Sequence, residues 1–370
     1  MREVEFHTKS HAQTPQPSQL SQRKMKLLLI GQGIAGTLLA WSLRRRGARV
    51  HIADGSLPGN SSQVAAGIIN SVTGKRFVKS WRFEEFFPAA KSAYQLLEKE
   101  LDISIWLEQP IVRLLATAEE ANDWSARCAL PDYADYLSES GDAGDWAGLA
   151  KPGFRFGKIH RAARVNFPVL TSAFRQKAIS EEIFFEKNVG YEEVEKWAAD
   201  YDAVVFCEGW RGQENPFFPN LPWQIAKGEA LLLRFQEEKS VRQIGQMLKK
   251  TMTLVPQGDG VFWAGGSYQW HFPDLLPSEG EKNFILHHLT EMLAAPFEIV
   301  GHVAGVRPTV KDRRPFIGQS LVRPNVFIFN GLGTKGALLG PFWAEHFAEH
   351  LLSGKLLDEE VDVRRFISKN

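Results

Sequence analysis

Residues 26–54 read KLLLIGQGIAGTLLAWSLRRRGARVHIAD, and this stretch decides the fold. Residues 27–30 form a continuous apolar run, typical of a strand that is buried on both faces of a parallel sheet. A glycine-rich turn follows, then an apolar helical pattern to Leu43, and then a second strand over residues 49–53. The order strand, tight turn, helix and strand predicts a βαβ unit within a parallel sheet.

The turn has the pattern G-x-G-x-x-G, formed by Gly31, Gly33 and Gly36, and Asp54 stands 18 residues after Gly36. Backbone N–H groups of such a turn and the positive end of the helix hold a pyrophosphate. An acid near this spacing accepts hydrogen bonds from a ribose. The pattern predicts a bound dinucleotide and suits NAD and FAD equally; the alternative is a tight turn without a ligand.

A second glycine-rich turn, GLGTKG at 331–336, follows the apolar residues 326–329 and precedes a long helix to about Leu352. A helix N-terminus stabilises negative charge, such as that of a reduced flavin ring. A simple NAD dehydrogenase has little use for this second turn, so we expect FAD. The alternative is an ordinary packing turn.

The middle of the chain carries fewer motifs. Residues 81–150 are rich in acids and aromatics and predict mostly helix, with helical apolar spacing clearest at 83–99. An antiparallel sheet that carries a substrate site is expected from the strand patterns of the second half. The other patterns indicate a helix at 164–178 and strands at 202–207, 230–235, 261–265 and 326–329.

The composition limits the function classes. A chain of 370 residues predicts two domains, or one domain with a large insertion. A net charge of +1 argues against a nucleic-acid partner or a polybasic membrane surface, and no run of 18 apolar residues predicts a membrane span. Cys128 and Cys207 stand far apart, which suggests no disulfide or zinc site and fits a cytoplasmic protein. Residues 1–24 are polar and predict a disordered tail.

Five segments occur in a characteristic order: IGQGIAG at 30–36, SSQVAAGI at 61–68, CEGW at 207–210, AGVRPTVKDRRPFIG at 304–318 and NGLGTKGALLGP at 330–341. Together they resemble the D-amino-acid oxidase/glycine oxidase superfamily of FAD-dependent oxidoreductases. The resemblance implies an α/β fold in which a Rossmann-like FAD-binding domain is interleaved with an antiparallel-sheet substrate domain. The expected FAD-binding domain comprises 25–80, 161–222 and 305–370, and the expected substrate domain comprises 81–160 and 223–304.

The resemblance also implies which residues meet a non-covalently bound FAD. Neither Cys128 nor Cys207 matches a position where some relatives attach the flavin covalently. The implied cofactor residues are Gly31, Gly33, Ile34, Ala35 and Gly36 at the pyrophosphate, Asp54 at the adenosine ribose, Ser61, Ser62, Ala66 and Gly67 at the pyrophosphate and flavin edge, Val189 at the adenine, Gly209 beside the cofactor, and Gly333, Thr334, Lys335 and Gly336 at the flavin pyrimidine ring.

Arg307 and Tyr268 are the expected substrate residues. In this superfamily the arginine that matches Arg307 grips a substrate carboxylate, and a planar guanidinium suits two charge-assisted bonds to a carboxylate. The alternative places Arg307 in a solvated charge cluster with Lys311, Asp312, Arg313 and Arg314. Tyr268 stands in GGSYQWHFP, where a hydroxyl and ring walls suit an amine-bearing ligand, although a packing role is equally open.

The histidine pairs predict no metal site. His346 and His350 are four residues apart on a helical pattern, but no H-E-x-x-H motif and no third ligand accompany them. His287 and His288 are adjacent, so we expect their side chains to point in different directions. The sequence also lacks the G-x-S-x-G and P-loop motifs of acyl and phosphoryl transfer.

These features lead to a hypothesis for the function: oxidation of the C–N bond of an amino acid or N-substituted amino acid to an imine, by hydride transfer to FAD. The partner is a small amine or amino acid, and the sequence defines no oligomeric state. Alternatives are a dehydrogenase that passes electrons to a carrier, an enzyme acting on an amine within a larger molecule, and a non-catalytic flavin-binding protein. Such hydride chemistry needs orientation and desolvation more than a side-chain base, so we assign no general base.

Overall fold

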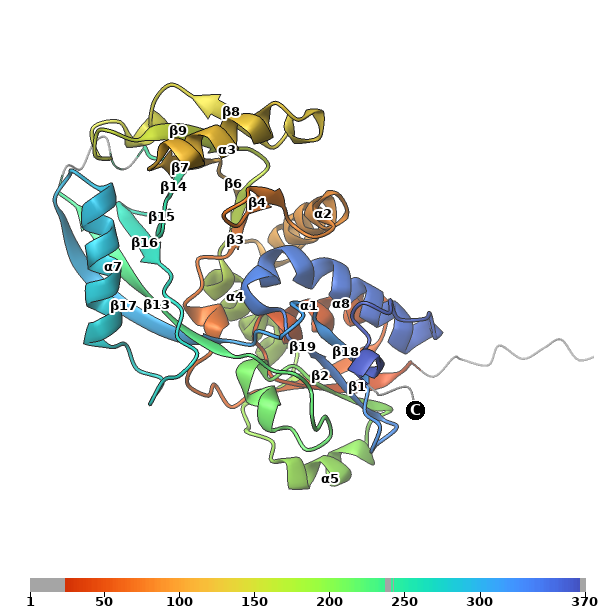
Figure 1. The fold of residues 1–370 in the computed structure, drawn as a ribbon. Coiled ribbons are helices and arrows are strands. Elements are labelled where there is room, and N and C mark those ends of the chain that lie inside the picture. Colours follow the sequence, from red (N-terminus) through yellow and green to blue (C-terminus); the bar gives the residue numbers. More distant parts are fainter. Residues whose placement is uncertain (1–23, 237–240, 242, 367–370) are drawn as a thin grey trace, which may run out of the picture.

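The computed structural model describes residues 24–236, 241 and 243–366. Two large sheets and their helices make up most of the molecule (Figure 1). The predicted disordered tail over residues 1–24 lies, apart from Lys24, outside the described residues.

A six-stranded sheet contains the βαβ unit of the opening stretch. Five of its strands pair in parallel, and the strand at one edge runs antiparallel to its neighbour. In spatial order the strands are β11 (Phe184–Phe185), β2 (Arg49–Ala53), β1 (Lys26–Ile30), β12 (Ala203–Phe206), β19 (Val326–Asn330) and β18 (Phe316–Gln319).

The apolar run of β1 is buried because helices cover the sheet on both faces. Leu27 and Leu29 belong to the large core on one face, whereas Leu28 and Ile30 belong to a separate core on the other. Such two-sided burial accounts for the absence of a polar alternation in this strand. The helices of the large core are α1 (Ile34–Arg45), α2 (Phe83–Leu101), α4 (Phe167–Ser180) and α8 (Gly336–Ser353), and α5 (Val194–Ala198) packs on the opposite face.

An eight-stranded sheet stands beside this unit, with α7 (Glu279–Met292) packed on it and α3 (Ala118–Cys128) next to one edge (Figure 1). Its strands are antiparallel except where β14 pairs with β7 in parallel. In spatial order they are β17 (Phe297–Arg307), β13 (Ala226–Phe235), β16 (Val261–Gly265), β15 (Thr253–Gly258), β14 (Met247–Lys249), β7 (Ile111–Leu115), β9 (Arg155–Ile159) and β8 (Leu137–Ser140).

Two small sheets and several short turns complete the described part of the chain. The three-stranded sheet joins β3 (Ile68–Ile69), β10 (Ala163–Val165) and β6 (Trp106–Glu108), and the two-stranded sheet joins β4 (Val72–Thr73) and β5 (Val78–Lys79). The 3₁₀ turns are Ser61–Gln63, Pro131–Tyr133, Gly144–Trp146, Tyr191–Glu193, Gly209–Glu214, Gly333–Lys335 and Val363–Phe366.

The prediction of mostly helix over residues 81–150 is wrong. This segment contains helices α2 and α3, but it also supplies strands β6, β7 and β8. The short apolar run of β7 forms a strand because β14 and β9, distant in sequence, pair with it on either side. The other predicted helices and strands are present, except that residues 164 and 165 of the predicted helix belong to β10 and the helix begins at Phe167. The division into domains at the expected boundaries stays a prediction. Within the described residues, no helix is both long and apolar enough to cross a membrane.

Candidate functional site

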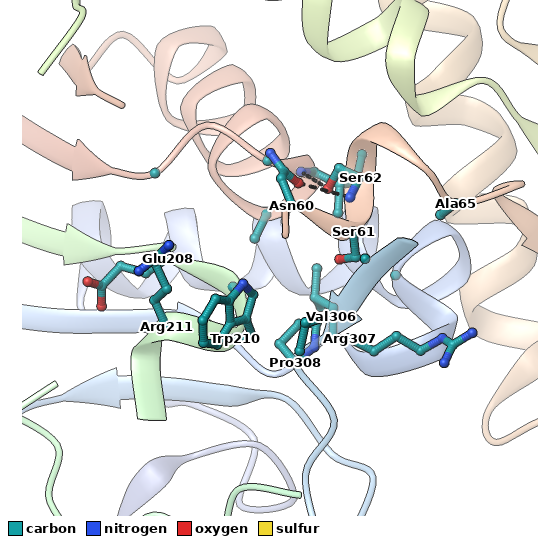
Figure 2. A pocket seen from close by; sticks show the side chains of 18 of the residues that line it. Asn60, Ser61, Ser62, Ala65, Glu208, Trp210, Arg211, Val306, Arg307 and Pro308 are labelled. Atoms are coloured by element: carbon teal, nitrogen blue, oxygen red, sulfur yellow. Dashed lines mark hydrogen bonds between the residues drawn. The ribbon is translucent and has the colours of Figure 1, made fainter. Parts of the chain in front are cut away.

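A cavity of about 470 Å³ opens at the carboxyl ends of β1, β2 and β12 and continues to the eight-stranded sheet. Ligands of open α/β sheets bind at this end of the strands. Figure 2 shows Glu208 and Arg211 at one end of the cavity and the side chain of Arg307 extending away from them. We call the end with Glu208 and Arg211 the nucleotide end, and the end with the Arg307 guanidinium the substrate end.

The first glycine-rich turn lines the cavity through Gly31, Gly33, Ile34 and Ala35. Gly31 has a φ of +101°, and a Cβ there would lie 2.5 Å from the Cys207 carbonyl oxygen. Gly33 is the N-cap of α1 and brings no side chain to the first turn of the helix. The start of α1 is therefore open to a ligand in the way that a pyrophosphate needs.

Gly36 does not line the cavity, contrary to its expected place at the pyrophosphate. A Cβ on Gly36 would lie 1.9 Å from the Gly31 carbonyl oxygen. The third glycine thus allows the helix and the turn to pack closely, which is a role of its own in this motif.

The segment after β2 forms the opposite wall of the cavity. Asn60 Oδ1 accepts a hydrogen bond from Ser62 N at 2.9 Å, and Ser62 Oγ accepts one from Ile34 N at 3.0 Å (Figure 2). Ser61, Ser62, Ala66 and Gly67, all predicted from the sequence, line the cavity together with Asn60. Asn60 was not predicted, although an asparagine before a short helical turn is a recognisable cap signal.

Asp54 lies at the end of β2 as predicted, but its carboxylate already has three partners. Gln32 N donates to Oδ2 at 2.6 Å, Ser56 N donates to Oδ1 at 2.8 Å, and Arg175 Nη2 lies 2.8 Å from Oδ1. Arg175 Nε also donates to Gln32 Oε1 at 2.7 Å. This network ties α4 to the glycine-rich turn, and the sequence shows no local signal for the contribution of Arg175.

Val189 and Gly209 line the nucleotide end of the cavity, and so does Glu208. Glu208 accepts hydrogen bonds from Tyr191 Oη at 3.0 Å and Asn215 Nδ2 at 2.8 Å. Burial raises the pKa of the Glu208 carboxyl from 4.5 to about 7, although both hydrogen bonds oppose the shift.

The second glycine-rich turn lines the cavity through Gly333, Thr334 and Gly336, at the start of α8. Lys335 does not line it, because its Nζ donates to Ser80 Oγ at 3.1 Å instead. Burial, together with Arg313 and Arg314, lowers the pKa of the Lys335 ammonium to about 8. Of the predicted residues in this turn, only Lys335 points elsewhere.

Arg307, the last residue of β17, lines the substrate end. Its Nη1 donates to the Ser267 carbonyl at 3.0 Å, and its guanidinium lies 4.5 Å from the centre of the Tyr268 ring. Within the described residues, no carboxylate forms an ion pair with Arg307. Burial lowers the pKa of the guanidinium below its ordinary value, with Tyr268 opposing the shift.

Arg307 is separate from the charge cluster that follows it. Arg314 stacks over the Trp81 ring at 3.7 Å, and its Nε lies 3.6 Å from Glu360 Oε1. The arrangement does not support the alternative that Arg307 is one member of a solvated cluster, since its guanidinium lines the cavity, where it contacts the Ser267 carbonyl and the Tyr268 ring.

Tyr268 lines the cavity and keeps 44% of its surface exposed. The neighbouring Trp270 is 46% exposed, with its ring centroid 5.2 Å from that of Tyr268. Trp263, which was not predicted, also lines the cavity and donates from Nε1 to the Val64 carbonyl at 2.9 Å. Strand β16 reads VFWAG, a continuous apolar run, so the sequence gives no sign that this tryptophan faces a ligand.

The histidine pairs engage protein groups. His346 Nε2 accepts from Asp358 N at 3.1 Å, and His350 Nδ1 lies 2.7 Å from the Lys355 carbonyl oxygen. The expectation that His287 and His288 point apart is wrong, because potential ligand atoms of both lie within 4.8 Å of one another and of a Glu291 oxygen. These three residues lie on one surface of α7, where Lys250 Nζ, 3.0 Å from Glu291 Oε2, already neutralises the carboxylate.

The cavity fits a dinucleotide that carries a redox-active ring. Two helix N-termini, those of α1 and α8, face it, and glycines at both turns leave the backbone accessible. The model for the family described as "FAD dependent oxidoreductase" matches residues 26–350. The chain belongs to this family, so it is an oxidoreductase that uses FAD.

Individual relatives agree with this assignment. The chain is 25% identical to the tRNA 5-methylaminomethyl-2-thiouridine biosynthesis bifunctional protein of Acinetobacter baylyi over 92% of its own length, and spans 56% of that protein. It is 23% identical to a glycine oxidase of Pseudomonas aeruginosa, covering 89% of this chain and 95% of that one. The structure of a glycine oxidase from Geobacillus kaustophilus superimposes with a TM-score of 0.73 at 20% identity, covering 91% and 97% of the two chains. The predicted family, mixed α/β fold and cofactor are confirmed.

Proposed function

We propose that this protein oxidises the C–N bond of an amino acid, or of an N-substituted amino acid, to an imine. The observation that carries the proposal is Arg307, a half-buried guanidinium that lines the cavity and has no carboxylate partner among the described residues. A planar guanidinium binds a carboxylate through two charge-assisted hydrogen bonds. The names of two relatives, both glycine oxidases, support an amino acid as substrate.

In the proposed reaction, FAD is the two-electron acceptor when bound. The α-hydrogen leaves carbon as a hydride with both bonding electrons, the nitrogen lone pair forms the C=N bond, and the nitrogen releases a proton to water. Water then hydrolyses the imine to an oxo acid and ammonia or an amine. Arg307 would fix the α-carbon by holding the carboxylate, while the Tyr268 ring would shield that contact from water.

We assign the cofactor residues by the same resemblance. Gly31, Gly33, Ile34 and Ala35 would meet the pyrophosphate, Asp54 the ribose, and Val189 the adenine, while Gly333, Thr334 and Gly336 would approach the flavin ring. We propose non-covalent attachment. Cys207 lines the cavity, but burial raises the pKa of its thiol far above the ordinary value and so disfavours the reactive thiolate.

Anaerobic mixing of the holoenzyme with amines tests the proposal. The panel pairs amino acids and N-methyl amino acids with the amines that lack only the carboxylate. We expect the visible flavin absorption to bleach with some of the acids and with none of the matched amines. Equal bleaching by acids and amines would contradict a carboxylate-anchored reaction.

A second candidate is an amine carried by a larger molecule. The exposed Tyr268 and Trp270 rings at the edge of the substrate end could contact a flat substituent on the nitrogen. Trp270→Ala should then lower kcat/KM for N-benzylglycine but not for glycine. Equal effects on both substrates would leave the smaller amino acid as the better candidate.

We also propose a cytoplasmic location. Both cysteines, Cys128 and Cys207, are free in the described part of the chain, as a reducing compartment allows. Fractionation of cells with an antibody to the untagged protein would test this.

A further inference from the structure

Strand β13 contains a polar triplet, Lys227, Gly228 and Glu229, before its apolar half. The side chains of Lys227 and Glu229 are 1% and 0% exposed, and Nζ lies 3.0 Å from Oε1. Because side chains alternate along a strand, both point to one face of the sheet, and Gly228 presents its bare backbone to the other.

Arg307 occupies the space that a side chain at Gly228 would fill. A Cβ on Gly228 would lie 2.0 Å from Arg307 Nη2, and one on Gly266 would lie 2.9 Å from the same atom. The guanidinium therefore lies in a slot formed by two glycines, and any larger residue at 228 would displace it.

Two carbonyl groups hold the guanidinium in this slot. Arg307 Nη1 donates to the Ser267 carbonyl at 3.0 Å and to the Lys227 carbonyl at 3.5 Å. The Lys227 carbonyl also accepts from Gln269 N at 2.9 Å, so residues 267–269 are paired with the same part of β13. Within the described residues, both side-chain bonds of Arg307 use Nη1, which leaves donors on Nη2 and Nε for a ligand.

Glu229 fastens both ends of the segment that supplies these contacts. Its main-chain oxygen accepts from Ser267 N at 3.1 Å, and its main-chain N donates to Ser267 Oγ at 3.0 Å. Its carboxylate accepts from Ser278 N at 2.8 Å and from Ser278 Oγ at 3.0 Å, and His302 Nε2 lies 2.8 Å from Oε2. The same segment carries Tyr268, whose ring covers Arg307.

We propose that Lys227, Gly228 and Glu229 are positioning residues that hold Arg307 ready for a ligand carboxylate. This inference rests on the proposed function. Gly228 provides the space, the Lys227 carbonyl fixes one nitrogen, and Glu229 anchors the segment that provides Ser267 and Tyr268. Carboxylate binding then needs little reorganisation of the arginine, because the guanidinium is already oriented.

Gly228→Ala tests the slot. The atoms that the new Cβ would meet are the far end of a flexible side chain, so we expect the fold and the FAD content to persist while the guanidinium moves. Binding of acetate and of uncharged acetamide to the holoenzyme is followed by the change in flavin absorption. The Kd for acetate should rise about tenfold or more, corresponding to about 1.4 kcal/mol, and the Kd for acetamide less than about twofold. Gly280→Ala, where a Cβ would meet nothing within 4 Å, is the matched control.

Glu229→Gln tests whether Glu229 anchors the segment that carries Ser267 and Tyr268. The Kd for acetate should rise about fivefold, as expected for partial loss of one charge-assisted contact. Glu298→Gln is the control, because Glu298 pairs with Arg234 across the same two strands at 3.4 Å but on the exposed surface. If Glu229→Gln does not fold, the double change Lys227→Met/Glu229→Leu removes the buried pair together, with the same expected loss of acetate binding.

Combination with Arg307→Ala separates positioning from a general structural effect. In that background, Gly228→Ala should cause no further loss of acetate affinity. Additive losses, or equal weakening of acetate and acetamide, would overturn the positioning role alone. Unchanged acetate binding in Arg307→Ala would overturn the proposed function and this inference together.

Discussion

At the nucleotide end of the cavity an acid is already paired, whereas at the substrate end an arginine is not. Asp54 receives two backbone hydrogen bonds and an ion pair from Arg175, whose Nη2 lies 2.8 Å away. Arg307 is bonded to neutral carbonyl groups and has no carboxylate partner in the described part of the chain.

The difference separates charges that serve the fold from a charge available to a ligand. Burying an unpaired ion is unfavourable, so buried charges are normally paired within the protein. Arginine cannot relieve the cost by losing its proton, because its pKa stays far above neutrality. The Asp54 network therefore stabilises the first glycine-rich turn, while Arg307, in the proposed function, keeps its positive charge for the carboxylate of a substrate.

Gly33→Val should produce the largest effect, loss of the cofactor altogether. A Cβ at Gly33 would lie 3.1 Å from Ser62 Oγ, and the branched side chain would project where the pyrophosphate is expected. The backbone φ of −81° suits other residues, so the protein should still fold. We expect FAD content below about a tenth of the wild-type value, measured by absorbance after denaturation. Gly141→Val, at a site with no atom within 4 Å of a Cβ, should retain FAD fully.

Arg175→Ala should weaken FAD binding by about tenfold, as expected for loss of one charge-assisted contact that orients Asp54. The change also removes the donor to Gln32 Oε1 in the glycine-rich turn. Fluorescence titration of apoprotein with FAD measures the effect. Arg44→Ala removes the surface ion pair with Glu181 and should leave the Kd unchanged. Equal Kd values for wild type and Arg175→Ala would show that Asp54 needs no cation for its role.

The smallest effect concerns Glu208, the acid at the nucleotide end that is held by neutral partners. Its pKa is about 7 in the folded protein, compared with the ordinary value of 4.5 that applies in the unfolded chain. Between these two pH values the folded state therefore keeps a proton on Glu208 that the unfolded state has lost. The contribution of Glu208 to the free energy of unfolding therefore falls as the pH rises from about 4.5 to about 7. Glu208→Gln should show a flatter Tm between pH 5 and 8 and a higher Tm than wild type at pH 8. A parallel pH dependence in both proteins would contradict the assigned pKa.

The nucleotide end could be predicted from the sequence because its elements are local. Strand, turn, helix and acid all lie within residues 26–54, and a turn that requires glycine leaves a visible pattern. Within that pattern the sequence did not separate Gly33, which lines the cavity, from Gly36, which only packs. Both positions require glycine, for different physical reasons.

The substrate end was less predictable because distant strands assemble it. Arg307 and Tyr268 were expected, but Gly228 was not, although β13 and β17 place it beside Arg307. Lys227 and Glu229 stand two residues apart on one face of β13, but such a pattern is normally solvent-exposed, so the sequence carries no signal that this pair is buried. The strands within residues 81–150 were missed for a related reason, since pairing across the sheet decides their structure.

Anaerobic reduction of the flavin in Arg307→Ala tests the central claim most directly. Arg307→Ala removes two charge-assisted hydrogen bonds, each worth about 1.5–3 kcal/mol. The affinity for an active amino acid should therefore fall about 100-fold or more, while the FAD content stays unchanged. Arg307→Lys keeps the charge without the planar fork and should restore part of the affinity. If the flavin of Arg307→Ala is reduced at the same rate and at the same amino-acid concentrations as that of the wild type, Arg307 does not anchor a carboxylate. The amino-acid substrate class must then be abandoned.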